Sequence, residues 1–218
     1  MTMTSRHLLR ALAAGAAAAL LVPTAAQADD CLLDRDNDGN VDAGSTDNDG
    51  AADSNNDDTS TACGVNATAS GQFATAIGSF ATASNARTLA AGRLATASGS
   101  DATALGHSAS ATADNSLAVG QSAAASGLGA VALGRSAVSS ASGAVAVGSA
   151  IAQANWSVAV GSNATVSSAA LSGVAIGLSS SVTASSGVAV GDNANAIGLY
   201  AVALGVNIAG AGNLTAAL

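Results

Sequence analysis

The chain contains no lysine and no glutamate, and its 218 residues include only one tryptophan, one tyrosine and two phenylalanines. Conventional globular cores depend on large buried side chains, so the scarcity of aromatics argues against a compact domain of ordinary packing. Without lysine or any basic stripe, nucleic-acid binding is excluded as a main activity. His107 is the one histidine after residue 28, so acid–base or nucleophilic catalysis cannot be assembled with confidence. We therefore predict that the protein is not an enzyme.

A glycine recurs along the chain in steps of fourteen residues, apart from one step of thirteen and one of sixteen. The recurring glycines are Gly64, Gly78, Gly92, Gly106, Gly120, Gly134, Gly148, Gly161, Gly177, Gly191 and Gly205. A short fixed period over this length is typical of a stack of identical supersecondary units. The sequence therefore predicts an all-β solenoid in which each coil contacts only its neighbours.

Two residues before each of these glycines stands an alanine, and the residues on either side of that alanine are mostly aliphatic or β-branched. In an extended segment the alanine points to one face and its two neighbours point to the other. We expect the alanines to fill a thin interior, together with those three after the glycine, such as Ala67 and Ala81. The other face would then carry an exposed aliphatic ladder that several copies bury around a symmetry axis. The residues predicted for this interface are Val145, Val147, Val158, Val160, Val174, Ile176, Val188, Val190, Val202 and Leu204.

Residues 1–28 have the features of a secretory signal peptide. Arg6 and Arg10 precede an apolar run from Ala11 to Val22, and residues 26–28 supply a small-residue cleavage pattern. A membrane anchor is disfavoured because it needs about 20 apolar residues, whereas this run is shorter and is followed by proline. We predict export, with a mature chain that starts near Asp29.

Residues 29–58 form an acidic segment with eleven aspartates. Two groups of alternating aspartates surround a glycine in the same register: Asp34, Asp36, Asp38 and Asp42 around Gly39, and Asp47, Asp49 and Asp53 around Gly50. Such loops supply the oxygen ligands that Ca²⁺ requires, so the segment is predicted to bind calcium and, when loaded, to cap the first coil. The EF-hand glutamate is missing, and the segment resembles the thrombospondin type-3 calcium repeats. The alternative is an acidic linker without a metal.

Cys31 and Cys63 bracket this acidic segment. In an exported protein we expect a disulfide between them. Alternatively, Cys63 packs as a small apolar residue beside Gly64.

The segments NSLAVGQSA (115–123) and NWSVAVGSNA (155–164) resemble the head repeats of trimeric autotransporter adhesins, the YadA-like family. The resemblance covers residues 59–218 and rests on recurrence of the pattern. It implies a left-handed parallel β-roll, a homotrimer, and attachment to host matrix, cells or other bacteria. Family members continue into a stalk and a membrane anchor, whereas this sequence stops at Leu218, so we expect a fragment of a longer surface protein. If it is not a fragment, a secreted head is expected.

Candidate ligand-binding residues occupy the position five before the recurring glycine. Phe73, Trp156 and Tyr200 share this position, and exposed aromatics often anchor interfaces. The alternative is that each aromatic plugs a turn or packs on the next coil. The resemblance adds Asn115, Ser116 and Ser157, because some family members bind collagen through the corresponding motifs.

Two other functions are compatible with a solenoid. Thr68, Thr82 and Thr96 align four residues after the glycine, as a row of hydroxyls on an ice- or mineral-binding face would. By the same count the row breaks at Ala124, Val138 and Ala152. The third possibility is a passive spacer that attaches to no receptor.

Overall fold

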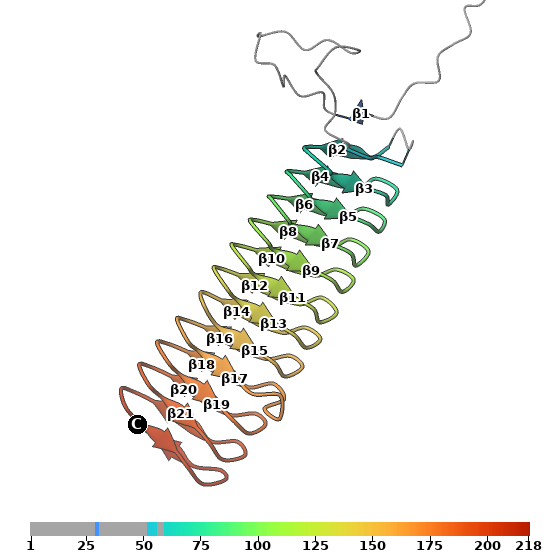
Figure 1. Ribbon diagram of the computed structural model, residues 1–218. Helices are drawn as coiled ribbons and strands as arrows, with labels where there is room; N and C mark the ends of the chain where they lie inside the picture. Colours follow the sequence, from blue (N-terminus) through green and yellow to red (C-terminus); the bar gives the residue numbers. More distant parts are fainter. Residues whose placement is uncertain (1–28, 31–51, 56–58) are drawn as a thin grey trace, which may run out of the picture.

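The computed structural model describes residues 29–30, 52–55 and 59–218. Over these residues the chain forms 24 short strands and no helix. All strand pairs are parallel, and the strands form two sheets along a rod of stacked coils (Figure 1). The predicted parallel β-solenoid with coils of about fourteen residues is thereby confirmed.

The sheet of thirteen strands, here the long sheet, follows the order β1-β2-β4 through β24. Its strands are β1 (Asp29–Asp30), β2 (Thr61–Cys63), β4 (Thr75–Ile77), β6 (Leu89–Ala91), β8 (Thr103–Leu105), β10 (Leu117–Val119), β12 (Val131–Leu133), β14 (Val145–Val147), β16 (Val158–Val160), β18 (Val174–Ile176), β20 (Val188–Val190), β22 (Val202–Leu204) and β24 (Ala216–Ala217). Identical positions of successive coils lie side by side, as Val145, Val158 and Val174 do.

The other sheet, here the short sheet, has eleven strands of two residues each. These strands are β3 (Thr68–Ala69), β5 (Thr82–Ala83), β7 (Thr96–Ala97), β9 (Ser110–Ala111), β11 (Ala124–Ala125), β13 (Val138–Ser139), β15 (Ile151–Ala152), β17 (Thr165–Val166), β19 (Ser181–Val182), β21 (Asn195–Ala196) and β23 (Ala209–Gly210). Each coil therefore contains one strand of each sheet and two turns.

The two turns of a coil have the same form. Turn 1 leads from the long sheet to the short sheet, as in Gly78–Ala81, and turn 2 leads back, as in Gly71–Ala74. In both, the amide of the fourth residue donates to the carbonyl of the first at 3.0 Å. The third residue, Phe80 or Phe73, has a φ of 58°. A positive φ at this position is the mark of a type II turn.

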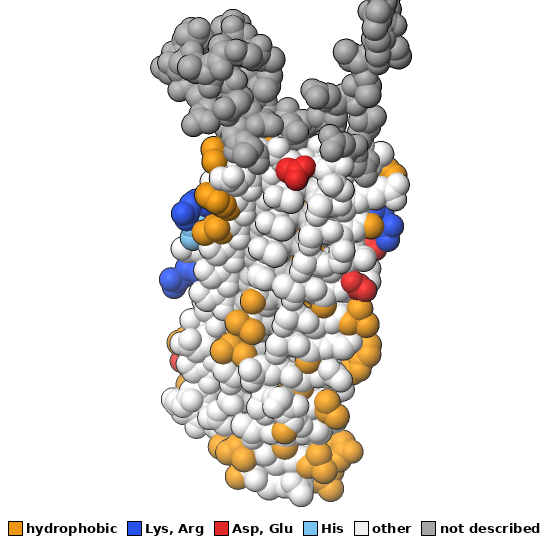
Figure 2. Space-filling view, turned by 45° about the vertical axis from the view of Figure 1, so that its right-hand side comes forward, with side chains coloured by type: hydrophobic (Ala, Val, Ile, Leu, Met, Phe, Trp, Pro, Cys, Tyr) orange, Lys and Arg blue, Asp and Glu red, His pale blue; other side chains and the backbone are white. Residues whose placement is uncertain are grey.

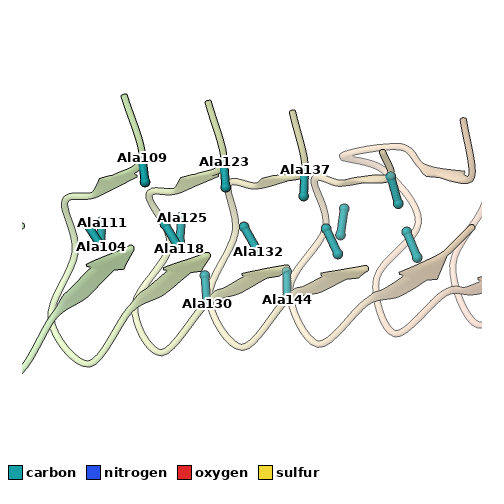
Figure 3. Close-up of a cluster of buried hydrophobic side chains, with 14 of the residues drawn as sticks. Ala104, Ala109, Ala111, Ala118, Ala123, Ala125, Ala130, Ala132, Ala137 and Ala144 are labelled. Atoms are coloured by element: carbon teal, nitrogen blue, oxygen red, sulfur yellow. The ribbon is translucent and has the colours of Figure 1, made fainter. Parts of the chain in front are cut away.

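Alanine fills the interior between the two sheets. Ala104, Ala109, Ala111 and Ala118 are fully buried, and Figure 3 shows such side chains directed between the two rows of strands. The predicted thin alanine interior is confirmed. Two sheets that are separated by methyl groups approach too closely to admit aromatic rings, which explains why the chain has so few.

The recurring glycine is required for two reasons, as Gly106 shows. Its φ is +129°, which L-amino acids rarely adopt. A Cβ added there would also lie 2.7 Å from the carbonyl oxygen of Gly120 in the next coil. The backbones of successive coils are thus in direct contact along this row.

Two valines replace alanine in the interior, and glycine compensates for each. Val166 and Val182 are fully buried in β17 and β19. A Cβ on Gly173 would lie 2.9 Å from Cγ1 of Val166, and one on Gly187 would lie 2.8 Å from Cγ1 of Val182. The filled volume of a coil is therefore conserved although its residues change.

The described ends of the acidic segment extend both sheets toward the N-terminus. β1 pairs with β2, and Asp53 forms a parallel bridge with Thr68. Ala52 and Ser54, on either side of Asp53, are buried. The stack therefore begins before residue 59, with an additional rung on each sheet.

Candidate functional site

The outer face of the long sheet carries the aliphatic ladder that the sequence predicts. Its side chains come from the first and third residues of the three-residue strands, and most are only half buried. Ile77, Ile176 and Leu204 are more exposed still, at 46%, 40% and 38%. The ladder runs along the rod as one stripe because the strands stack in register. Figure 2 shows hydrophobic side chains in several separate patches on the face of the rod that is in view.

Four of the six predicted ligand residues are exposed in the second turn. Phe73, Asn115, Trp156 and Tyr200 each occupy its third position, with φ between 57° and 61°. The aromatic rings are 53%, 67% and 53% exposed for Phe73, Trp156 and Tyr200 respectively. The same left-handed conformation recurs at the third position of most turns of the rod, so it follows from the turn type and does not by itself distinguish these four residues.

Ser116 and Ser157, the other two predicted ligand residues, lie in the interior. Their relative exposures are 1% and 0%. Each hydroxyl donates to the carbonyl three residues earlier, Ala113 or Ala154, at 2.6 Å. These serines replace interior alanines, so in this chain neither offers a side chain to an external ligand.

Sequence reasoning missed three exposed leucines at the position before the one that the aromatics share. Leu128, Leu171 and Leu199 occupy the second position of turn 2 and are 57%, 50% and 39% exposed. Reading this position of the repeat together with the next would have revealed these leucines among the polar residues of turn 2. Turn 2 therefore presents a second hydrophobic surface that the long sheet does not share.

Charged side chains lie mainly on coils nearer the N-terminus, and residues 136–218 contain only Asp192. Arg87 and Asp101 occupy turn 2 of adjacent coils, where Arg87 Nε donates to Asp101 Oδ1 at 2.5 Å and Nη2 donates to Oδ2 at 2.7 Å. This hydrogen bonding lowers the pKa of Asp101 and raises the pKa of Arg87. Because both side chains are exposed, the pair contributes little to folding.

The threonine row lies on the outer face of the short sheet. Thr68, Thr82 and Thr96 are paired in register, as the sequence predicts. The row breaks at Ala124 and Val138, as predicted, but in the next coil it breaks at Ile151 rather than at Ala152, because Val138 pairs with Ile151 and Ala152 is buried. The coil of thirteen residues loses its residue in turn 1, before the strand, so counting from Gly148 gives a register that is wrong by one.

The calcium and disulfide predictions involve residues outside the described part of the chain. Asp34, Asp36, Asp38, Asp42, Asp47 and Asp49 lie there, as does Cys31. Asp53 is exposed, and its Oδ1 accepts the amide of Asn55 at 2.7 Å. Asp30, which precedes Cys31 in the sequence, pairs with Ala62, which precedes Cys63. Among the residues that the structure describes, no free cysteine, no cluster of three metal-binding side chains and no helix able to span a membrane is found.

Comparison with known families identifies the repeat. The family model described as YadA head domain repeat matches residues 58–81, 69–95, 97–123, 125–150 and 183–207. No match to the chain is found among curated proteins. The matched segments together cover more than half of the chain, and their repeats coincide with the coils of the solenoid. The chain therefore belongs to the YadA head repeat family, an adhesin-type family of structural rather than enzymatic proteins.

Proposed function

We propose that this chain is the head of a trimeric surface adhesin, exported from the cell and attached to host matrix, cells or other bacteria. The observation that supports a trimer best is the half-exposed aliphatic ladder of the long sheet. Each valine that becomes fully buried there contributes roughly 1 kcal/mol. Summed over the length of the rod, this contribution exceeds the entropic cost of bringing the chains together.

Oligomerisation is tested by placing a charge on the ladder. In a trimer, Val160→Asp brings three carboxylates together in an apolar interface, so we expect dissociation or failure to assemble. Thr165→Asp is the matched control, because Thr165 follows in the same coil on the outer face of the short sheet. Sedimentation velocity should give a trimer for the wild type and the control. A stable wild-type monomer would contradict the proposal.

Attachment is tested with the purified wild-type protein on surfaces coated with collagen, fibronectin or whole cells. An adhesin head should bind at least one of them in a saturable manner, and multivalency should make the trimer bind far better than a monomeric variant. A trimer that binds none of them would support the spacer function instead.

Export and the two N-terminal features are part of the same proposal. We expect N-terminal sequencing of the mature protein to begin at Asp29, and mass spectrometry under non-reducing conditions to show a bond between Cys31 and Cys63. The pairing of Asp30 with Ala62 supports this bond, since paired positions of parallel strands are close enough for a disulfide. We propose that the acidic segment binds Ca²⁺, and calorimetric titration that gives no heat with millimolar Ca²⁺ would refute this.

A second candidate function rests on the short sheet. Thr68, Thr82 and Thr96 form an aligned row of hydroxyls on its outer face. Such a row suits a lattice of ordered water or a mineral surface. Thermal hysteresis or inhibition of crystal growth by the purified protein would support this function, and the absence of both would eliminate it.

A further inference from the structure

The stack departs from its regular period around Trp156. The coil that contains Trp156 has thirteen residues, and the next coil has sixteen. Residues 151–182, which include Trp156 and the longer coil's additional residues, lie in the longest gap between the segments that match the family. In repeat proteins, insertions map to loops on one face, which is often the binding face.

The two additional residues of the longer coil enlarge its second turn. They form an extra turn over residues 167–170, in which the amide of Ala170 donates to the carbonyl of Ser167 at 2.9 Å. The enlarged loop is visible after β17 in Figure 1. It is fixed to the following coil, because the hydroxyl of Ser185 donates to the carbonyl of Ala169 at 2.9 Å. The insertion is thus a defined ledge in the coil that follows Trp156.

The indole of Trp156 is held against the preceding coil. A Cβ on Gly143 would lie 2.5 Å from Cε3 and 2.7 Å from Cζ3 of Trp156, so the ring covers the backbone of Gly143. The side chain is nevertheless 67% exposed. A ring that rests on backbone on one side and is open on the other is a preorganised stacking surface.

Free space adjoins this ring. Gly129, one coil beyond Gly143, has a φ of +62°, and a Cβ added to it would have no neighbour within 4 Å. Asn115 continues the row with an exposed amide side chain. From Asn115 to Trp156 the row spans three coils, or about 14 Å at the usual strand spacing. This length favours an extended chain over a single small molecule.

From Leu128 to Trp156 the second turns are uncharged, whereas Asp114, exposed beside Asn115, brings one carboxylate to the other end of the row and disfavours an anionic ligand. Ser142 and Asn155 lie beside the two glycines and the tryptophan, while Leu128 exposes aliphatic surface. A matching ligand needs apolar C–H faces to stack on the indole, hydroxyl or amide groups for hydrogen bonds, and no net charge. We propose that turn 2 between Asn115 and Trp156 is a binding site for a neutral linear oligosaccharide. This proposal specifies the class of ligand that the proposed adhesin head binds, and it therefore rests on the proposed function.

The test exploits the fact that Trp156 is the sole tryptophan of the chain. Intrinsic fluorescence of the wild-type protein is measured during titration with cellohexaose and with chitohexaose, and dextran sulfate serves as the charged control. We expect a saturable blue shift with at least one neutral oligosaccharide, because stacking removes water from the indole.

Two variants distinguish the contribution of the indole from that of the backbone on which it rests. Trp156→Ala should abolish retardation in native gels that contain a neutral polysaccharide. Gly143→Ala keeps the indole but forces it off the backbone, so binding should weaken about 5- to 100-fold, the range expected when one stacking contact is lost. Phe80→Ala is the control, since Phe80 is also an exposed aromatic at the third position of a turn but lies in turn 1, outside the row. Its binding should equal that of the wild type, and all three variants should keep the wild-type circular dichroism spectrum.

Three results would overturn the inference. One is the lack of a fluorescence change with either neutral oligosaccharide, and another is a response to dextran sulfate alone. The third is a shift that follows trimer dissociation on dilution, which would make the tryptophan a subunit contact. If adhesion of the wild-type trimer to matrix or cells persists in these cases, only the oligosaccharide site fails and the proposed function stands.

Discussion

Interior volume must be conserved within each coil, and the pair Val182 and Gly187 allows a quantitative test. Val182→Ala removes two buried methyl groups and leaves a cavity, which should destabilise the chain by about 2–3 kcal/mol. Gly187→Ala adds a methyl group 2.8 Å from Val182 Cγ1, so overpacking should cost about 1–3 kcal/mol. Because the φ of Gly187 is not in the left-handed region, its backbone accepts alanine without strain.

The double variant should be far more stable than the sum of these effects. It recreates the alanine pair that Ala97 and Ala102 form in an earlier coil, where both are fully buried. We expect it to lie within about 1.5 kcal/mol of the wild type, which implies a coupling energy of about 2–4 kcal/mol.

Urea unfolding followed by circular dichroism measures all four proteins of this cycle. The control cycle combines Gly187→Ala with Val166→Ala, because Val166 is not among the nearest neighbours of a Cβ at position 187. This control should show no rescue. If the effects of Gly187→Ala and Val182→Ala on the free energy of unfolding are additive, the reasoning is refuted. The occurrence of glycine beside the larger valine would then not be explained by compensation of volume.

Three further predictions concern glycines, turns and charge. Gly106→Ala should destabilise the fold by more than about 3 kcal/mol, because alanine rarely adopts this φ and its Cβ would overlap the backbone of the next coil. Gly129→Ala should cost only about 1 kcal/mol, because its Cβ would enter open space. Thermal unfolding distinguishes the two variants. Ser122→Gly should stabilise by up to about 1 kcal/mol in urea unfolding, because Ser122 is exposed with a φ of 57°. Asp101→Asn should lower the melting temperature slightly at neutral pH. Because the pKa of Asp101 is lowered in the folded state, Asp101 stabilises the fold above the ordinary carboxyl pKa, and this stabilisation disappears as the pH falls through the lowered value. The melting temperatures of wild type and variant should therefore converge in acid. They should also converge in high salt, which screens the ion pair.

Much of the fold could be predicted from the sequence because each coil repeats the same few constraints. The glycine must be glycine, the alanine before it must be small, and the residues flanking that alanine alternate in direction. Ala104 and Val147 therefore lie on the predicted faces, inward and outward respectively. Because the backbones of successive coils touch, a change in the path of one strand would displace the strands next to it. The repeated sequence pattern is therefore a reliable guide to the fold of each coil.

The prediction failed where the repeat was counted across a missing residue, and where a family motif was carried over to side chains that are buried in this chain. Ile151, not Ala152, continues the outer row, because the missing residue falls in the preceding turn. Ser116 and Ser157 are predicted as ligand residues from the family resemblance, yet both are buried, because a serine hydroxyl that donates to a carbonyl of its own turn can be buried at little cost. Local hydrogen bonding of this kind leaves no periodic signal in the sequence.

The two irregular coils show how the architecture separates stability from recognition. Both the deletion after Gly148 and the insertion after Val166 fall in turns, and the strands on either side keep their pairing in both sheets. Changing a turn therefore leaves the alanine interior and the aliphatic ladder intact, while changing a strand disturbs every contact of its coil. Surface features such as the ledge over residues 167–170 can consequently vary without loss of the rod. Turns, and the second turn above all, are the positions where ligand specificity should be sought in this solenoid.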